Sequence, residues 1–165
     1  SCRVPTIAAL NGFVTGGGAG IAASCSIRIG SEDVKIGVPI ARTLGNCLAI
    51  GTLRRFVALV GVARTRYILL TAQLIDGKEA STAGFISELL ADKAAVTDRA
   101  FQLAASMTNF APLTLKASMT ALNRIQAATS IPSDHDIIEM CYGSEDFKEG
   151  MSAFFEKRKP NWQGK

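Results

Sequence analysis

The residues with the clearest chemical potential form a glycine run, Gly16-Gly17-Gly18-Ala19-Gly20, between two apolar stretches. A glycine turn between a strand and a helix leaves backbone N–H groups exposed at the positive end of the helix dipole. Such a turn stabilises an anion, either a phosphate or the oxyanion of a thioester, and glycine lets the ligand approach closely. The alternative is that these glycines serve only the tight packing of a strand against a helix.

The sequence gives little support for a nucleotide-binding or nucleic-acid-binding function. The glycine run is not G-x-G-x-x-G with an acidic residue at the ribose distance, and it does not end in Gly-Lys-Ser or Gly-Lys-Thr. The net charge is +4, and much of the positive excess lies in Lys157-Arg158-Lys159 and Lys165. Aromatic residues make up 7% of the chain and are not interleaved with a basic stripe, so we expect no nucleic-acid partner.

The other reactive side chains are four cysteines, Cys2, Cys25, Cys47 and Cys141, and one histidine, His135. The cysteines form no C-x-x-C pair and no zinc spacing with histidine, so the sequence predicts no metal site. Free thiols without a secretory signal indicate a reducing, cytoplasmic compartment. The most apolar stretch is too short to span a bilayer, so we expect no membrane insertion.

The composition is that of one globular domain. The 165 residues are 48% hydrophobic and 19% charged, which allows a real core. The first part reads as a strand over Pro5–Phe13 that ends in an Asn11-Gly12 turn, then the glycine turn with its helix. Two further short strands are predicted at Cys25–Ile29 and Val34–Ile36.

Helical spacing begins at Ala49, where Leu53, Phe56, Val57 and Val60 recur on one face. Gly61 is expected to break this helix, which restarts over 63–70. Asp76 and Glu79 form a capping pair for a short helix that ends at Gly84. A strand over Phe85–Leu90 follows.

Beyond about Ala91 the pattern is helical throughout. It predicts helices over Asp92–Met107, Pro112–Ala128, Ser133–Cys141 and Ser144–Lys159, the last with Ser144 as its N-cap. The chain is therefore an α/β segment over residues 1–91 followed by a helical region over residues 92–165.

Several stretches keep a characteristic order along the whole chain: PTIAALNGF at 5–13, GGG at 16–18, CSIRI at 25–29, IGVP at 36–39, LVGVAR at 59–64, LTA at 70–72, ASTAGFI at 80–86 and SEDFKEGMSAFFEKRKP at 144–160. Together they closely resemble the crotonase (enoyl-CoA hydratase/isomerase) family. The resemblance implies part of a ββα superhelix followed by a helical trimerisation region, hence a homotrimer or hexamer. It also implies an acyl-CoA thioester as ligand, with CoA as part of the substrate and no other cofactor.

In that family two backbone N–H groups polarise the thioester carbonyl. The resemblance places one of them on Gly17, flanked by Gly16 and Gly18. The other comes from an upstream segment, so we expect this chain to be the carboxyl-terminal part of a longer protein and to hold half of the oxyanion hole.

Family hydratases also carry two glutamates, at positions that correspond here to Gly20 and Ile40. Neither residue can transfer a proton, so hydration by the usual route is in doubt. Other members place a nucleophile in the following loop, at the position of Cys47 here, and Asn46 beside it is expected to orient a water or a substrate group. A helix start near Cys47 is expected to lower the pKa of its thiol. A buried, inert cysteine is the alternative.

Three charged or aromatic residues complete the predicted site. Arg42 is expected to meet a charged acyl substituent or a neighbouring subunit, or else to be a solvated loop residue. The resemblance places Phe154 near the ligand and lets Lys157 meet its phosphates. Three functions stay open: an acyl-CoA lyase or isomerase acting through a stabilised enolate, a non-catalytic acyl-CoA-binding or scaffold protein, and an inactive fragment.

Overall fold

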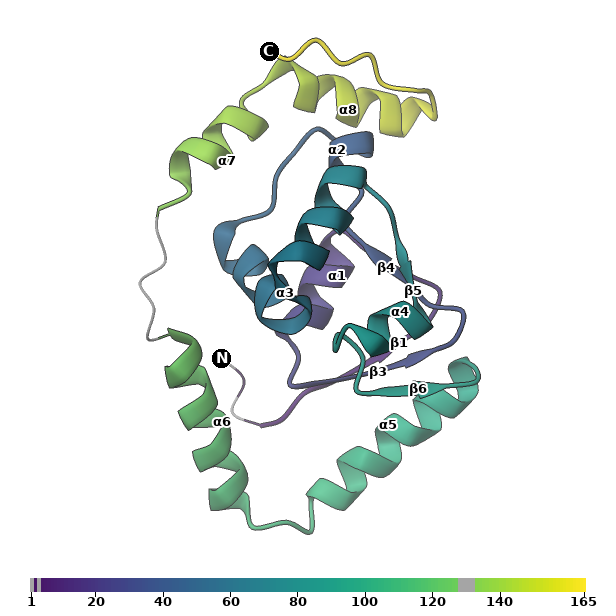
Figure 1. Cartoon of the computed structure of the whole chain (residues 1–165), viewed down its shortest axis with the longest axis vertical. Helices are drawn as coiled ribbons and strands as arrows, with labels where there is room; N and C mark the ends of the chain where they lie inside the picture. The colour runs from purple at the N-terminus through teal and green to yellow at the C-terminus, as the bar shows by residue number, and fades with distance from the viewer. Residues whose placement is uncertain (1, 3, 128–132) are drawn as a thin grey trace.

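Two small sheets form the first part of the chain in the computed structural model, which describes residues 2, 4–127 and 133–165 (Figure 1). One sheet has the order β1-β3-β6 with parallel neighbours, and the other has the order β2-β4-β5, in which β2 and β4 are parallel and β5 is antiparallel. The strands are β1 Ile7–Leu10, β2 Phe13–Thr15, β3 Ile27–Ser31, β4 Lys35–Gly37, β5 Ile75–Asp76 and β6 Glu88–Leu90.

The turn predicted at Asn11-Gly12 is confirmed, and the strand before it is the shorter β1, Ile7–Leu10. Gly12 has a φ of +58°, which favours glycine, and its carbonyl accepts a 2.7 Å hydrogen bond from the Lys35 amide. The turn sends β1 and β2 into different sheets. Two other strands are displaced from their predicted bounds, since β3 extends to Ser31 and β6 begins at Glu88.

The helices of the described residues are α1 Gly17–Ser24, α2 Ile40–Thr43, α3 Ile50–Thr71, α4 Gly77–Thr82, α5 Lys93–Met107, α6 Pro112–Ala127, α7 His135–Tyr142 and α8 Glu145–Glu156. The predicted break at Gly61 is a kink inside α3, where Gly61 has φ 76° and ψ 164°. Helix α8 ends before the predicted Lys159, because Lys157 adopts a left-handed conformation with φ 55°. The predicted end of α6 at Ala128 lies outside the described residues.

Side-chain caps start three of these helices, and the caps at Asp76 and Ser144 are the predicted ones. Asp76 accepts a hydrogen bond from the Glu79 amide, Asp92 from the Ala95 amide and Ser144 from the Phe147 amide, at 2.9, 2.9 and 3.0 Å. Each cap satisfies an amide that has no partner inside its helix.

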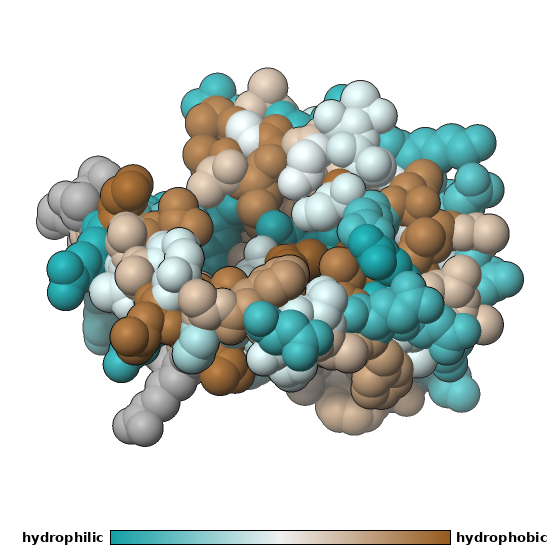
Figure 2. Space-filling view, turned by 90° about the horizontal axis from the view of Figure 1, so that it is seen from below, coloured by the Kyte–Doolittle hydropathy of each residue, from teal (hydrophilic) through white to brown (hydrophobic). Residues whose placement is uncertain are grey.

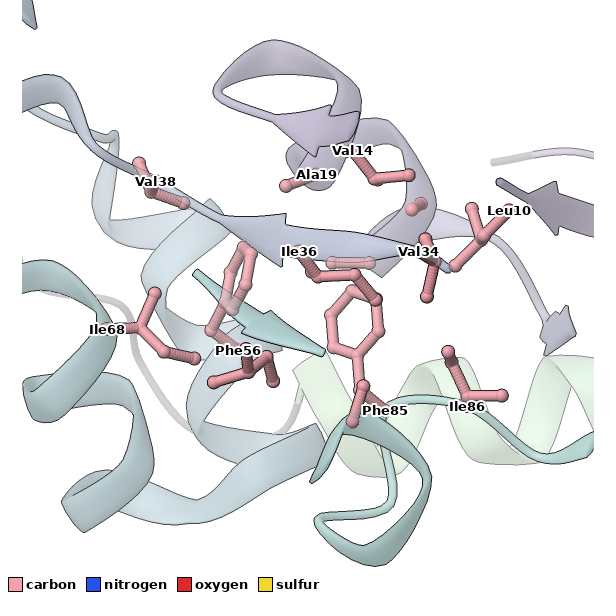
Figure 3. Close-up of a cluster of buried hydrophobic side chains, with 14 residues drawn as sticks. Leu10, Val14, Ala19, Val34, Ile36, Val38, Phe56, Ile68, Phe85 and Ile86 are labelled. Atoms are coloured by element: carbon pink, nitrogen blue, oxygen red, sulfur yellow. The ribbon is translucent and has the colours of Figure 1, made fainter. Parts of the chain in front are cut away.

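The core lies between the second sheet and helices α1 and α3 (Figure 3). Ile36 of β4 is fully buried, and the rings of Phe56 and Phe85 pack at 5.6 Å. Alanines cover the inner face of α1, which lets this helix approach α3 closely. The buried alanines are Ala19, Ala22 and Ala23.

The described residues after β6 form helices and connecting loops that curve around the α/β core (Figure 1). Helix α5 is tied to β6 by the Arg99 guanidinium, which binds both Glu88 carboxylate oxygens at 2.7 and 3.0 Å. Helices α6 and α7 bury none of their described residues. The division into units 1–91 and 92–165 stays a prediction.

Apolar side chains remain uncovered on this helical arm. Helices α5 and α6 border a groove of about 630 Å³ whose lining includes Ile7, Phe101 and Leu115. The face seen from below carries many hydrophobic side chains and is hollowed near its centre (Figure 2). Within the described residues, no helix combines the length and apolar character needed to cross a bilayer.

Helix α8 and the chain end close over the loop that follows α2. A Cβ added at Gly150 of α8 would lie 2.5 Å from the Leu44 carbonyl oxygen, so only glycine permits this approach. Trp162 packs beside Gly45, and Asp146 accepts hydrogen bonds from the amides of Gln163 and Gly164 at 2.6 and 2.8 Å. The loop after Ile40 is therefore held by the carboxyl-terminal segment.

We expect Gly150→Ala to lower the free energy of unfolding by about 1–3 kcal/mol, because the added methyl group collides with the Leu44 backbone. Urea unfolding measures the loss, and the emission of Trp162, the single tryptophan, should shift to the red as α8 moves away. Gly51→Ala is the matched control, since its Cβ would meet only the Arg55 side chain at 3.9 Å. A Gly150→Ala protein with the free energy of unfolding and the tryptophan emission of the wild type would contradict this packing.

The pairing of Glu149 with Arg158 should give the chain end a pH dependence. The Arg158 guanidinium binds the Glu149 carboxylate at 2.5 and 2.9 Å and, with the Asn161 amide, lowers the pKa of Glu149 from 4.5 to about 2. A lowered folded-state pKa stabilises the protein above the unfolded value, and the stabilisation is lost as the pH falls from about 4.5 to 2.

The difference in urea midpoint between wild type and Arg158→Ala should therefore shrink across this pH window. Lys148→Ala is the control, because Lys148 pairs with Glu145 on the exposed surface of α8. A difference that stays constant from pH 6 to 2 (a span of about four units) would show that Glu149 titrates independently of Arg158.

Candidate functional site

The register of β2 and β4 brings two predicted site segments together. Thr15 lies opposite Gly37 in this parallel pair, so the chain leaves both strands at the same edge of the sheet. The glycine turn follows β2, and Pro39 and Ile40 follow β4. Ligand sites of open α/β sheets lie at such carboxyl edges.

The glycine turn opens helix α1 as the sequence predicts. Gly16 is the N-cap residue with a φ of +55°, and its amide donates to the Gly37 carbonyl at 3.2 Å. The amides of Gly17 and Gly18 belong to the first helical turn, where no intrahelical acceptor exists. Both residues are exposed, and a Cβ at either would meet no atom within 4 Å. The turn thus presents accessible N–H groups at the positive end of a helix dipole.

The two positions without glutamate lie in apolar surroundings. A Cβ at Gly20 would lie 3.4 Å from the Thr52 methyl group of α3, which is ordinary contact. Ile40 is half-buried and packs against the hydrophobic core. Gly20 and Ile40 themselves offer no group that transfers a proton near the glycine turn.

The loop between α2 and α3 runs along α7. Asn46 Nδ2 donates to the Tyr142 hydroxyl at 3.2 Å, and the Cys47 thiol donates to the Ile137 carbonyl at 3.7 Å. Asn46 Oδ1 is buried and has no hydrogen-bond partner within the described part of the chain. This oxygen is a free acceptor beside the chain segment that carries Ile40.

The expected lowering of the Cys47 pKa does not occur. Burial is the largest cause and raises the pKa of the thiol to about 11, and the Cys141 side chain and the Asp134 carboxylate add to the effect. The helix start near Cys47 is already occupied, because Asp134 Oδ2 accepts from the Ile50 amide at 2.7 Å. Cys47 is therefore a poor nucleophile near neutral pH.

The remaining predicted residues lie on the surface of this chain. Arg42 is exposed on α2, and Lys157 is exposed at the end of α8. Phe154 is 63% exposed and packs edge to face with Phe155 at 5.9 Å. None of the three is drawn into the glycine turn by the contacts that the structure shows.

Sequence reasoning missed the residues that hold this region together. Gly150 in the middle of a strongly amphipathic helix was the available signal of a close approach. Trp162, Asp134 and Thr52 carry no local signal, because their partners lie far away in the sequence. Among the described residues, no group of three or more His, Cys, Asp or Glu side chains could hold a metal ion.

The enoyl-CoA hydratase/isomerase family profile matches residues 1–165. The short-chain-enoyl-CoA hydratase of Clostridium acetobutylicum is 35% identical over 158 residues, which cover 94% of this chain and 60% of the relative. The 2,3-dehydroadipyl-CoA hydratase of Escherichia coli is 30% identical over 164 residues, covering 98% of this chain and 64% of the relative. The crystal structure of methylmalonyl-CoA decarboxylase with 2-nitronate-propionyl-CoA superposes with a TM-score of 0.87 at 25% identity, covering 98% of this chain and 63% of that one.

The chain therefore belongs to the enoyl-CoA hydratase/isomerase family, the crotonase family. It spans about three-fifths of the length of the relatives it matches. The mixed α/β architecture that the sequence predicts is confirmed by the structural match.

The raised pKa of Cys47 gives a test of its surroundings. Thiolate absorbance or the rate of iodoacetamide modification at Cys47 should rise with a midpoint near pH 11. Cys141→Ala should lower this midpoint, because the neighbouring thiol is one of the groups that raise the pKa. Cys25→Ala, a change outside this cluster, should leave it in place. A midpoint below the ordinary value of 9.0 would restore Cys47 as a nucleophile.

Proposed function

We propose that this chain is the thioester-polarising part of a protein that acts on an acyl-CoA through an oxyanion-stabilised enolate. The observation that carries the proposal is the start of helix α1, where the exposed Gly17 amide follows the positive-φ residue Gly16. A backbone N–H in this setting donates to the carbonyl oxygen as negative charge develops on it. CoA enters as part of the substrate, and no separate cofactor is proposed.

The proposed chemistry differs from hydration by paired glutamates. Gly20 and Ile40 stand where family hydratases carry those residues, and neither moves a proton. The names of similar proteins include hydratases and a decarboxylase, which supports a family scaffold that serves more than one reaction. Decarboxylation forms an enolate without a general base on the α-carbon, so a site that keeps only the oxyanion donor suits such a reaction.

Asn46 is proposed to serve this site as a polar positioning group. Its Oδ1 atom is a buried acceptor with an unused lone pair, and its Nδ2 atom is held by Tyr142 at 3.2 Å. A water molecule or a substrate N–H is the partner that this oxygen requires. Cys47 is assigned a packing role instead, because its raised pKa leaves little thiolate.

A non-catalytic acyl-CoA-binding or scaffold role is the second candidate. It is favoured by Ile40, which packs into the core, where a carboxylate would have to be desolvated. An inactive fragment is the third possibility.

A homotrimer or hexamer belongs to the proposal and is supported by the exposed apolar residues Phe154, Phe155 and Leu122. The four free cysteines support a cytoplasmic setting.

Two substitutions at Gly17 test the oxyanion donor. Gly17→Pro removes the N–H and adds a ring that the first helical position tolerates, because proline is favoured there. Gly17→Ala keeps the N–H and places a methyl group in open space. With crotonyl-CoA and methylmalonyl-CoA as substrates, we expect Gly17→Pro to lower any turnover by about a hundredfold or more, and Gly17→Ala to change it little.

Isothermal calorimetry with the same thioesters separates the candidates. Turnover that is lost in Gly17→Pro supports the enzyme. Binding that is weakened in Gly17→Pro, in a protein that shows no turnover, supports the acyl-CoA-binding role. Circular dichroism confirms that both variants remain folded. Failure of the folded chain to bind any acyl-CoA would contradict both roles and leave the inactive fragment.

A further inference from the structure

Two cysteines from distant parts of the chain meet beside the candidate site. Cys47 lies in the loop between α2 and α3, and Cys141 lies in the last turn of α7. The Cys47 sulfur is 3.7 Å from the carbonyl oxygen of Ile137, one helical turn before Cys141 and therefore on the same face of α7. The Cys141 side chain is also among the neighbours that raise the pKa of the Cys47 thiol.

Flanking contacts hold the two segments alongside each other. Asn46 donates to the Tyr142 hydroxyl at 3.2 Å, and the Ile50 amide donates to Asp134 at 2.7 Å. The earlier loop residue, Asn46, contacts the end of α7, and the later residue, Ile50, contacts its start. The two segments therefore run in opposite directions. Contacts on both sides of the cysteine pair thus hold the two backbone segments alongside each other, as an intramolecular disulfide requires.

We propose that Cys47 and Cys141 are a redox modification site that forms a reversible intramolecular disulfide with a low-molecular-weight disulfide as the oxidant. Both residues are half-buried and free. Cys141 also lines an open cavity of about 660 Å³, bordered by Ala41 and Gly45, so a small oxidant reaches it from solvent. In a reducing compartment a disulfide of this kind is transient and responds to the redox state.

The reaction proceeds by two thiol–disulfide exchanges. The Cys141 thiolate attacks one sulfur of the external disulfide, which forms a mixed disulfide and releases one external thiol after protonation. Cys47 then gives up its proton, slowly at neutral pH because the pKa of its thiol is raised, and attacks the Cys141 sulfur, which forms the Cys47–Cys141 bond and releases the second external thiol. Two cysteine thiols lose two electrons and two protons, and one external disulfide becomes two thiols.

The disulfide would fasten the loop after Ile40 to helix α7. This loop carries Asn46 and supports α8 through Leu44 and Gly45. Oxidation therefore restricts the segment next to the glycine turn without changing any residue of the turn itself. The inference stands on the cysteine geometry and is independent of the proposed acyl-CoA chemistry.

Glutathione disulfide is the probe for the purified, fully reduced chain. We expect at least two of the four thiols to stop reacting with Ellman's reagent under denaturing conditions, and exposed Cys2 adds to this loss where it takes up glutathione. Non-reducing peptide mapping should then show a Cys47–Cys141 cross-link, and dithiothreitol should restore all four thiols. The urea midpoint of the oxidised chain should exceed that of the reduced chain, because the cross-link restricts the unfolded state.

Single serine variants complete the test. Cys47→Ser and Cys141→Ser should each prevent the intramolecular bond and stop at a glutathione adduct, whereas Cys25→Ser should still form it. Four thiols that stay free in the folded chain, or a cross-link that joins Cys2 to Cys25, would overturn the proposal. A cross-link that appears only between chains on non-reducing electrophoresis would also overturn it.

Discussion

The parallel pairing of β2 with β4 is the constraint on which the candidate site depends. It sets Thr15 beside Gly37 and so brings the glycine turn next to Pro39 and Ile40. The Gly16 amide adds a hydrogen bond to the Gly37 carbonyl at the end of this pair. Because Ile36 and Val38 of the same stretch are fully buried, a shift of the pairing would move apolar side chains out of the core.

The small residues of α1 extend this constraint to the neighbouring helix. Buried alanines bring α1 against α3, and Gly20 meets Thr52 across that contact. The helix therefore has little freedom to tilt, and the direction of its first amides is fixed by packing. A site that works by backbone N–H groups needs such rigidity, because the donors have to point at the oxyanion before it forms.

The carboxyl-terminal segment adds a second layer of control over the loop after Ile40. Gly150 allows α8 to touch the Leu44 backbone, and Trp162 lies beside Gly45. Helix α7 contacts the next residues, Asn46 and Cys47. This loop is thus shaped by residues 90 or more positions later in the chain, which explains why its chemistry differs from the expectation based on local sequence.

The sequence alone carried the features that depend on near neighbours. Asp76 and Ser144 cap helices as predicted, the glycine turn opens a helix, and ordered motifs lead to the family. Local patterns predicted the turn at Gly12 and the interruption at Gly61, but they could not show that β1 and β2 join different sheets, because that outcome depends on partners elsewhere in the chain.

The same limit applies to the chemistry of single groups. The sequence itself shows that positions 20 and 40 are glycine and isoleucine, and therefore that neither position has an ionisable side chain. The pKa of Cys47 depends on burial and on Cys141 and Asp134, which only the tertiary structure brings to it. Burial and through-space charge belong to the packed molecule, so the sequence determined which groups are available and the fold decided what each of them can do.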